Sequence, residues 1–484
     1  MTTDNMIYAD DPMNDTTAEI AGRWSELLKP RYLASTITLC LGVALFAFNE
    51  FFISTALPTA VEELGGAALL SWAITFYLVF AIIGGMTAAN LKQRFGARLT
   101  LLAAAALFVV GTMLAVTATA MPQVLVGRLL QGAGEGVVAA LCYALIPELF
   151  PSRLVPKVFG AEAIVWASAA FAGPLVAGGL TEHISWRAAF FISVPAAALF
   201  CLLVLVIVPR AGAAPSASRP IPFLRLAAAG CGILLISVSA AMELAGLQML
   251  FLTIAALILV VSVRLDRRSL SPVLPSAAFS FHRSLGTGLW VVFLMPLFQS
   301  VGAVFIVYSL QHLWGLGPMA AGGLSAVMAI FWSLVAIGVA SIPSHGLRNR
   351  ITQAGPVLLA VGLAVLVVAL WTGLIWLVPL AQALIGSAFG ICWGTLSQLM
   401  MDVSSDVERD RTSAMLPTLQ SAGYAIGAAV WGFVANASGF AEAAAPETIR
   451  HAMLVVFSVS AILSLSAIWF GFRTVRLARA EDRL

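Results

Sequence analysis

The chain is a succession of apolar runs, each long enough to cross a lipid bilayer. A membrane-spanning helix needs about 20 apolar residues, and charged residues, prolines and polar clusters separate runs of that length along most of the 484-residue sequence. We therefore expect an all-α polytopic membrane protein with 14 transmembrane helices. The candidate spans lie near 33–61, 69–91, 99–120, 122–148, 155–182, 187–208, 223–243, 247–264, 285–312, 318–343, 351–370, 373–401, 411–437 and 447–472.

The composition excludes a water-soluble fold. Apolar residues make up 61% of the chain and charged residues only 10%, with a mean hydropathy of +0.98, whereas a soluble domain carries about 25% charged residues. A soluble enzyme, a nucleic-acid-binding protein and a disordered scaffold are therefore excluded. We expect a multi-pass protein of the inner or plasma membrane whose main surroundings are the lipid bilayer.

The basic residues predict the orientation. Cytoplasmic loops of membrane proteins are enriched in Lys and Arg. With 14 spans and both termini in the cytoplasm, 23 of the 26 basic residues fall in cytoplasmic segments. Removing a single span would reverse every later loop and abolish this bias, so we expect 14 spans with both termini cytoplasmic.

Transporter folds are often built from repeated bundles, and the spans divide here as six, two and six. We expect two six-helix bundles that face each other across a central cavity, with the middle pair of helices packed at the periphery. The predicted segments are an N-terminal cytoplasmic tail (1–30), an N-terminal bundle (31–208), a linker with two additional helices (209–284), a C-terminal bundle (285–472) and a C-terminal cytoplasmic tail (473–484).

The cysteines and histidines indicate no metal or cofactor site. All five cysteines lie within apolar runs, no Cys-X-X-Cys occurs, and the five histidines are scattered. A membrane metalloenzyme would need clustered ligands, and a primary pump would need a Gly-Lys-Ser/Thr phosphate loop, which is absent from the sequence. We expect a transporter without a cofactor, working as a monomer on a small molecule; a polytopic membrane enzyme is the less favoured alternative.

Three ionisable residues lie inside predicted spans and are candidates for proton coupling. Ionisable side chains in a membrane interior are costly and usually line an aqueous path. Arg128 and Glu135 are seven residues apart on one face of the fourth span, about 10 Å along the axis, so each needs another partner or water. Glu50 lies past the middle of the first span, where desolvation disfavours its charged form. A structural ion pair is the alternative role for each.

A further carboxylate, Glu162, lies about two turns from the cytoplasmic end of the fifth span. Two interpretations remain open for it: a functional group within the membrane, or a carboxylate that reaches the surface.

Polar and aromatic side chains near the middle of the spans predict the wall of a substrate cavity. Such a wall suits a ring-bearing solute that is uncharged or weakly cationic, although each residue alone could equally face lipid or the core. The candidate substrate-binding residues are Asn49, Gln131, Tyr143, Trp166, Gln299, Tyr308, Gln311, Trp332, Trp393, Gln420 and Tyr424.

The fifth span is a candidate conformational gate, since it contains Gly173 and Pro174 among small residues. Small residues let helix backbones approach closely, and proline bends a helix, so the fifth span could form a sliding contact with the second bundle.

These motifs resemble those of the major facilitator superfamily, and within it the 14-span drug:proton antiporter group. The resemblance covers nearly the whole chain. Arg128-Leu-Leu-Gln-Gly-Ala-Gly134 is similar to the fourth-span motif whose arginine is tied to proton transfer, Gly173-Pro174-Leu-Val-Ala-Gly178 to the fifth-span antiporter motif, and Ser185-Trp186-Arg187 through Pro195 to the signature that enters the sixth span. It implies a proton-coupled carrier that works by alternating access.

The chain departs from the family pattern at two places. The basic loop after the second span, with Arg94, Gly96 and Arg98, resembles the family's loop motif, which implies a second candidate conformational gate there. Gln93 stands where that motif has an aspartate that latches the cytoplasmic gate. Asn49 stands where the first-span motif has an acid, and the acid of this chain is the next residue, Glu50. A shift of one residue rotates the side chain by about 100° around the helix. Either Glu50 takes over from a different angle or coupling rests on Glu135. Drug or metabolite efflux is the leading expectation, and uptake of an aromatic nutrient or vitamin such as riboflavin is the alternative.

Overall fold

The computed structural model describes residues 23–151, 154–210, 223–239, 244–269, 272, 274–340, 345–442 and 445–481, and its regular structure is helical throughout this part of the chain. The α-helices are α1 (Trp24–Leu27), α2 (Pro30–Leu64), α3 (Leu70–Phe95), α4 (Ala97–Val116), α5 (Met121–Leu149), α6 (Val155–His183), α7 (Trp186–Phe191), α8 (Ser193–Ile207), α9 (Phe223–Ser239), α10 (Ala245–Arg267), α11 (Ser284–Trp314), α12 (Pro318–Ala340), α13 (His345–Thr372), α14 (Leu377–Asp402), α15 (Asp406–Ala437) and α16 (Pro446–Glu481). Short 3₁₀ turns occur at Ala67–Leu69 and Phe440–Glu442.

Every predicted span coincides with a helix or helix pair, and the all-α membrane fold is confirmed. Within the described ranges, 12 helices are long and apolar enough to cross a membrane. Two elements fall outside that set: α9, whose apolar stretch Ala227–Ser239 is short, and α15, which begins with a charged turn from Asp406 to Arg411. The last residues of the predicted seventh span, 240–243, lie outside the described residues, as do 1–22 of the predicted N-terminal tail.

The sixth span is two helices rather than one. Helix α7 ends at Phe191 and α8 begins at Ser193. Pro195 lacks the N–H that would bond to the carbonyl of Phe191, which weakens the helix at this point. The Ser193 hydroxyl donates a 2.8 Å hydrogen bond to the Phe190 carbonyl.

Helices α2 to α8 form one packed group, in which α5 lies against both α3 and α4 and α2 against α6. Glycines permit the closest of these contacts: a Cβ on Gly134 of α5 would lie 2.5 Å from the Ala104 carbonyl oxygen of α4, and one on Gly132 would collide with the Tyr77 backbone of α3. These glycines therefore allow close packing of α5 against α3 and α4.

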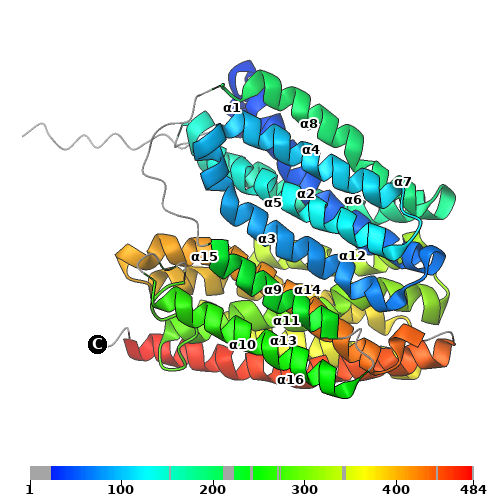
Figure 1. Cartoon of the computed structure of the whole chain (residues 1–484). Helices are drawn as coiled ribbons and strands as arrows, with labels where there is room; N and C mark the ends of the chain where they lie inside the picture. Colours follow the sequence, from blue (N-terminus) through cyan, green and yellow to red (C-terminus); the bar gives the residue numbers. More distant parts are fainter. Residues whose placement is uncertain are drawn as a thin grey trace, which may run out of the picture.

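Helices α11 to α16 form the second group, which lies below the first in Figure 1. Helix α11 packs against α15 and α16, and α14 packs against α12 and α13. The Trp431 indole of α15 donates a 2.7 Å hydrogen bond to the Leu297 carbonyl of α11. Of the 31 residues of α11, most are buried, which makes it the central helix of this group.

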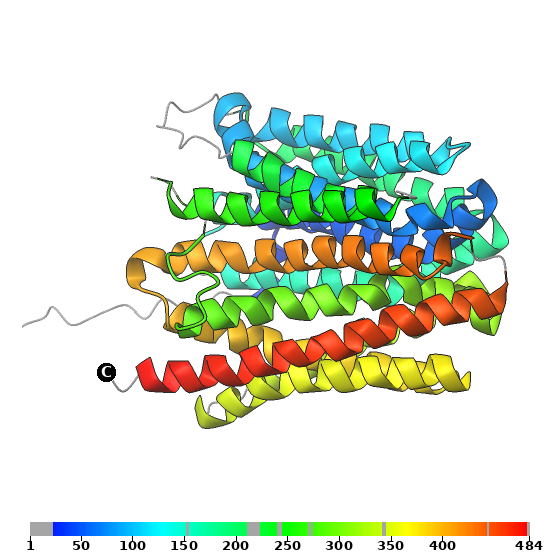
Figure 2. The ribbon, with the colours of Figure 1, turned by 60° about the horizontal axis from the view of Figure 1, so that its bottom comes forward.

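Helices α9 and α10 form a hairpin that lies along the seam between the two groups. Figure 2 shows the hairpin (green) between the first group (cyan and blue) and α15 (orange). Ile233 and Ile236 of α9 pack with Val79 of α3 and Ala425 of α15. Arg225 pairs with Asp266 across the hairpin at 2.5 Å. The α9–α10 hairpin therefore contacts both helix groups.

The two groups also meet at the end of the molecule where α6 finishes, which we call the Glu182 end. There the Met319 backbone N–H at the start of α12 donates to Glu182 at 3.4 Å, and the Asn436 side chain of α15 donates to the Ala68 carbonyl at 3.1 Å. Gly178 of α6 lies directly against the Met319 backbone, and Gly432 of α15 against Ser71 of α3. The Glu182 end is thus closed by close contacts between the two groups.

Candidate functional site

The centre of the first helix group holds a hydrogen bond between two of the predicted residues. The Asn49 amide of α2 donates to Oε2 of Glu135 on α5 at 2.8 Å. Both side chains are buried, with 1% of each residue exposed. The second oxygen of Glu135, Oε1, is buried without a hydrogen-bond partner. Glu135 is therefore a buried carboxyl that is only half satisfied, which leaves one oxygen free to take a proton.

Arg128 is buried two turns before Glu135 on the same helix, with only 2% exposed. Its Nη1 donates to Oε1 of Gln131 at 2.8 Å, and its Nε donates to the Ala73 carbonyl at 3.3 Å. The guanidinium also lies over the Tyr77 ring, 3.9 Å from the centroid. As the spacing predicts, Arg128 bonds to other groups and not directly to Glu135.

Tyr77 of α3 completes this cluster, although nothing in the sequence singles it out. Its ring supports Arg128, and its hydroxyl is buried near Glu135 without a hydrogen bond of good geometry. The signal available in the sequence is a single tyrosine in the middle of the second span, which resembles any other core aromatic. Only the helix packing brings it to Arg128, 51 residues later in the chain.

Glu50 points to a different side of α2 from Asn49. Its side chain is exposed, in contrast to buried Asn49 and Glu135. It lies close enough to interact electrostatically with Arg128 in the first group and with Tyr424 on α15 in the second. Glu50 is thus an exposed carboxyl with ionisable groups of both helix groups around it.

The predicted amide residues divide between the two groups. Gln131 is fully buried; it accepts from Arg128 and donates to the Thr112 hydroxyl at 2.9 Å, so it holds α5 against α4. Gln299 on α11 lies with its Nε2 3.0 Å from the Met328 sulfur, and its oxygen is buried without a partner. Gln311 has a buried, unpartnered amide nitrogen. Gln420 lies one turn before Tyr424 on α15 and is partly exposed.

The predicted aromatic residues lie at different levels of the molecule. Trp166 meets the Phe46 ring edge-on at 5.7 Å, and Tyr143 stacks on Phe159 at 6.0 Å, both within the first group. Tyr308 stacks on His312 at 3.8 Å, toward the Glu182 end. Trp332 packs on Phe389 at 4.9 Å within the second group. Two of these aromatic residues thus lie in the first helix group and two in the second.

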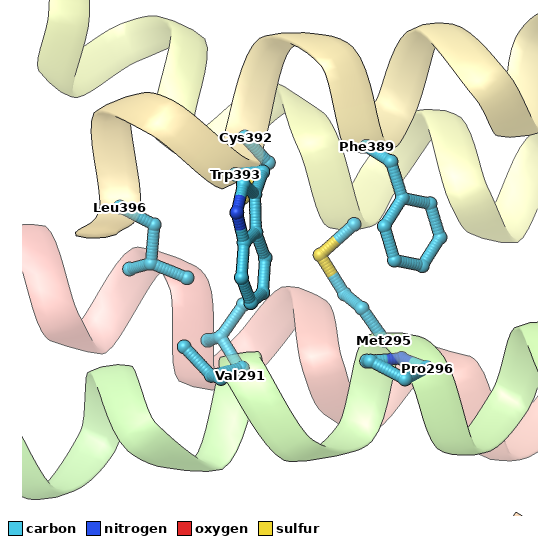
Figure 3. A pocket seen from close by; sticks show the side chains of 8 residues that line it. Val291, Met295, Pro296, Phe389, Cys392, Trp393 and Leu396 are labelled. Atoms are coloured by element: carbon cyan, nitrogen blue, oxygen red, sulfur yellow. The ribbon is translucent and has the colours of Figure 1, made fainter. Parts of the chain in front are cut away.

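Trp393 projects from α14 toward α11, where it borders a small apolar cavity (Figure 3). Val291, Met295 and Leu396 line the same space, which measures about 10 Å³. A cavity of that size holds at most one water molecule. It is therefore a packing defect in the second helix group rather than a compartment for an organic solute.

The predicted gate residues occupy two positions. Gly96 has φ +80° at the corner between α3 and α4, a conformation that favours glycine. Arg98 beside it donates to the Leu205 carbonyl of α8, and Arg94 lies over the Phe95 ring at 5.4 Å. Lys92, the residue before Gln93, forms an ion pair with Glu148 of α5.

The second gate segment lies at the contact between the helix groups. Gly173 of α6 packs against Phe51 of α2, and Pro174 lies against Gly322 of α12. The small residues of the fifth span therefore lie in close contact with α12, and this contact continues to the close approach of Gly178 to Met319.

Glu162 is buried, with 1% exposed, so it does not reach the surface. Of the two interpretations that the sequence leaves open, the surface carboxylate is therefore wrong. Among the described residues, no group of three or more His, Cys, Asp or Glu side chains is arranged to hold a metal ion.

Comparison with known proteins identifies the family. The Major Facilitator Superfamily model matches residues 39–405. A probable multidrug-efflux transporter of Mycobacterium tuberculosis is 32% identical over 94% of this chain and 98% of its own length. A multidrug efflux pump of Staphylococcus aureus is 24% identical over 84% of this chain and 90% of its own. The chain belongs to the major facilitator superfamily, and it is a transporter of the cell membrane rather than an enzyme.

Solved structures share this fold. A POT family peptide transporter superposes with a TM-score of 0.66 over 91% of this chain and 96% of its own, at 16% identity. A D-xylose–proton symporter gives 0.62 over 90% and 97%, also at 16% identity. At these identities the likeness concerns the fold alone. The resemblance to major facilitator carriers seen in the motifs is confirmed.

Proposed function

We propose that this protein is a proton-coupled antiporter that exports a small amphipathic or aromatic organic solute by alternating access. The observation that carries the proposal is the buried cluster of Asn49, Glu135, Arg128 and Tyr77, with Glu50 exposed beside it. A half-satisfied buried carboxyl and an accessible carboxylate, both near one arginine, can exchange protons as their surroundings change.

The proposed topology has 14 spans with both termini in the cytoplasm. Helices α9 and α15 serve as spans in addition to the 12 that meet length and hydropathy criteria. The bundles are 31–208 and 285–472, with the α9–α10 hairpin in the linker between them. The distribution of Lys and Arg supports this arrangement. It makes the Glu182 end the external end.

In this topology the structure is closed toward the outside. The contacts of Met319 with Glu182, and of Asn436 with Ala68, then form the external gate. Opening to the outside requires α6 to separate from α12 at Gly178, where the backbones touch. Proton binding and solute binding each shift the equilibrium by their different affinity for the two conformations.

The division of roles follows from the exposure of the two carboxyls. Glu50 lies between the bundles near Tyr424 and is placed to meet both the solute and water. Glu135 is sealed within the first bundle and is placed to hold a proton against Asn49 and Arg128. A cationic solute at Glu50 and a proton bound in the same cluster repel each other electrostatically, so binding of one disfavours binding of the other. Antiport requires this competition between solute and proton.

Efflux is supported by the relatives, two of which are named as multidrug-efflux proteins. Tyr424 and Gln420 support the proposed class of solute. They lie one turn apart on one face of α15, and Glu50 lies near that face. Flat aromatic rings beside a carboxylate favour a ring-bearing weak cation.

Accumulation of ethidium and riboflavin in cells that express the protein tests the proposal, with and without a protonophore. We expect lower ethidium in expressing cells and loss of that difference when the protonophore is added. The Glu50→Gln variant serves as the matched control, because it keeps the side-chain volume and removes the charge. Raised riboflavin with unchanged ethidium would contradict efflux and support nutrient uptake.

A further inference from the structure

Glu162 is a buried carboxyl that the proposed coupling cluster does not use. It lies on α6 with 1% of the residue exposed, and neither of its oxygens has a hydrogen-bond partner. Burying a polar group without a hydrogen bond is costly, and burying an unpaired charge is far more so. A carboxyl retained in such a position needs a physical explanation.

The ionisable groups that face Glu162 are all weak acids. They are the Cys40 thiol from α2 and the Cys142 thiol and Tyr143 hydroxyl from α5. Helix α12, which packs against the outer half of α6, contains no ionisable residue. On α6 itself the nearest cation is Lys157, which lies over the Trp24 ring of α1 at 5.5 Å. No cation among the described residues therefore compensates a negative charge at Glu162.

The protonation state follows from these surroundings. An ionised Glu162 would be an uncompensated charge in an apolar interior, whereas a protonated carboxyl avoids that cost. Glu162 thus carries a proton in this conformation. It can ionise only if α6 moves away from α2 and α5 and water reaches it.

Its position connects it to the coupling cluster. Glu162 faces Cys142, which follows Glu135 on α5 by seven residues, or about 10 Å along the helix. One turn after Glu162, Trp166 contacts Phe46, and Phe46 stacks on Tyr77 at 6.1 Å. Tyr77 in turn supports Arg128. Packed rings therefore connect α6 to the residues around Glu135.

We propose that Glu162 is a second proton-binding site of the transport cycle, which holds a proton in this conformation and releases it to cytoplasmic water when the part of α6 that follows Val155 moves away from α2 and α5. The step is the ionisation of one carboxyl: the O–H bond breaks, the electron pair stays on the carboxylate, and water accepts the proton. The role in the cycle rests on the proposed antiport, whereas the protonated state rests on the burial alone.

Infrared spectroscopy of the purified full chain tests the protonated state without any substrate, because a protonated carboxyl absorbs apart from a carboxylate. We expect the Glu50→Gln/Glu135→Gln double variant to keep a protonated-carboxyl band near pH 7, where exposed carboxyls with a pKa of about 4 are ionised. Adding Glu162→Gln should remove that band. Adding Glu447→Gln instead, at an exposed position, should leave it unchanged.

A band that survives Glu162→Gln would overturn the proposal. Because glutamine is isosteric with the neutral carboxyl, the variant should fold. If the triple variant does not fold, wild type is compared with the Glu162→Gln single variant instead. Neither comparison depends on transport.

A second measurement tests the role in the cycle. The protein is reconstituted in vesicles, and the protons exchanged per ethidium transported are measured for wild type and Glu162→Gln. The ratio should fall in the variant while ethidium transport continues. An unchanged ratio would contradict a role in coupling. If wild type moves no protons with ethidium, the proposed antiport fails, and the infrared result still decides whether Glu162 holds a proton.

Discussion

Asn49 and Glu135 are joined by a 2.8 Å hydrogen bond between α2 and α5 in the buried centre of the first bundle. Asn49 occupies the position where related carriers have an acid, so the amide makes this bond where two carboxylates would repel each other. The adjacent residue, Glu50, is exposed between the bundles. Two adjacent residues of α2 thus point in different directions. The buried Asn49 amide bonds to Glu135, and the Glu50 carboxylate is exposed.

Replacement of Asn49 by alanine should destabilise the protein and impair coupling. It removes the donor and leaves Oε2 of Glu135 without its described partner, which costs about 1–3 kcal/mol. We expect a lower Tm in thermal unfolding of the detergent-solubilised protein. Ser54→Ala on the same helix is the control, because the Ser54 hydroxyl bonds only locally, to the Phe51 carbonyl. Equal Tm values for the two variants would contradict the role of the Asn49–Glu135 bond.

Arg128→Lys should abolish most transport although it keeps the positive charge. Lysine cannot bond to both Gln131 and the Ala73 carbonyl while its charge stays over the Tyr77 ring. A desolvated cation–π contact alone is worth about 2 kcal/mol, so we expect at least a tenfold loss of ethidium transport. Tyr77→Phe keeps the ring and should retain the contact. Near-normal transport by Arg128→Lys would show that the geometry of the guanidinium is unimportant.

Gly178→Ala should weaken closure of the external gate. The added Cβ would collide with the Met319 backbone, whereas a Cβ on the neighbouring Gly179 meets nothing within 4 Å. Overpacking of this kind costs about 1–3 kcal/mol, which shifts the conformational equilibrium about 5–150-fold. Cysteines introduced at Ala68 and Asn436, in a background without native cysteines, should cross-link less in Gly178→Ala and normally in Gly179→Ala. Equal yields would contradict the gate.

Glu63→Ala should lower stability more than Glu62→Ala. Glu63 accepts hydrogen bonds from Arg187 at 2.6 Å and from the Trp186 indole at 2.8 Å, which tie α2 to α7. Removing a carboxylate with two such bonds costs about 1–3 kcal/mol. The Tm of each single variant measures the difference. A larger effect at Glu62 would show that these two bonds contribute little.

Hydropathy and spacing were sufficient to predict the helical membrane architecture, because a run of about 20 apolar residues has few other outcomes. The break after Phe191 could not be predicted, because the effect of Pro195 on the helix depends on local geometry. The place of the α9–α10 hairpin could not be predicted either, since its isoleucines match any apolar surface and only packing selects α3 and α15.

Site residues that are rare inside membrane spans could be predicted from the sequence, whereas residues that are common there could not. Charged residues inside spans stand out, so Glu50, Arg128 and Glu135 could be found from the sequence. Tyr77 could not, because a mid-span tyrosine is ordinary until a guanidinium lies over it. Gln131 was expected to face a substrate, yet its amide is occupied by Arg128 and Thr112, a matter of which helix face meets which neighbour.

Proton movement driven by solute in reconstituted vesicles tests the proposed antiport most directly. An ethidium gradient is imposed on vesicles that contain a pH-sensitive dye, with no other driving force. We predict that wild type moves protons against the ethidium flow, and that the Glu50→Gln/Glu135→Gln variant does not. Proton movement of equal size in the double variant, or ethidium transport without any proton movement in wild type, would contradict coupling through these two carboxyls.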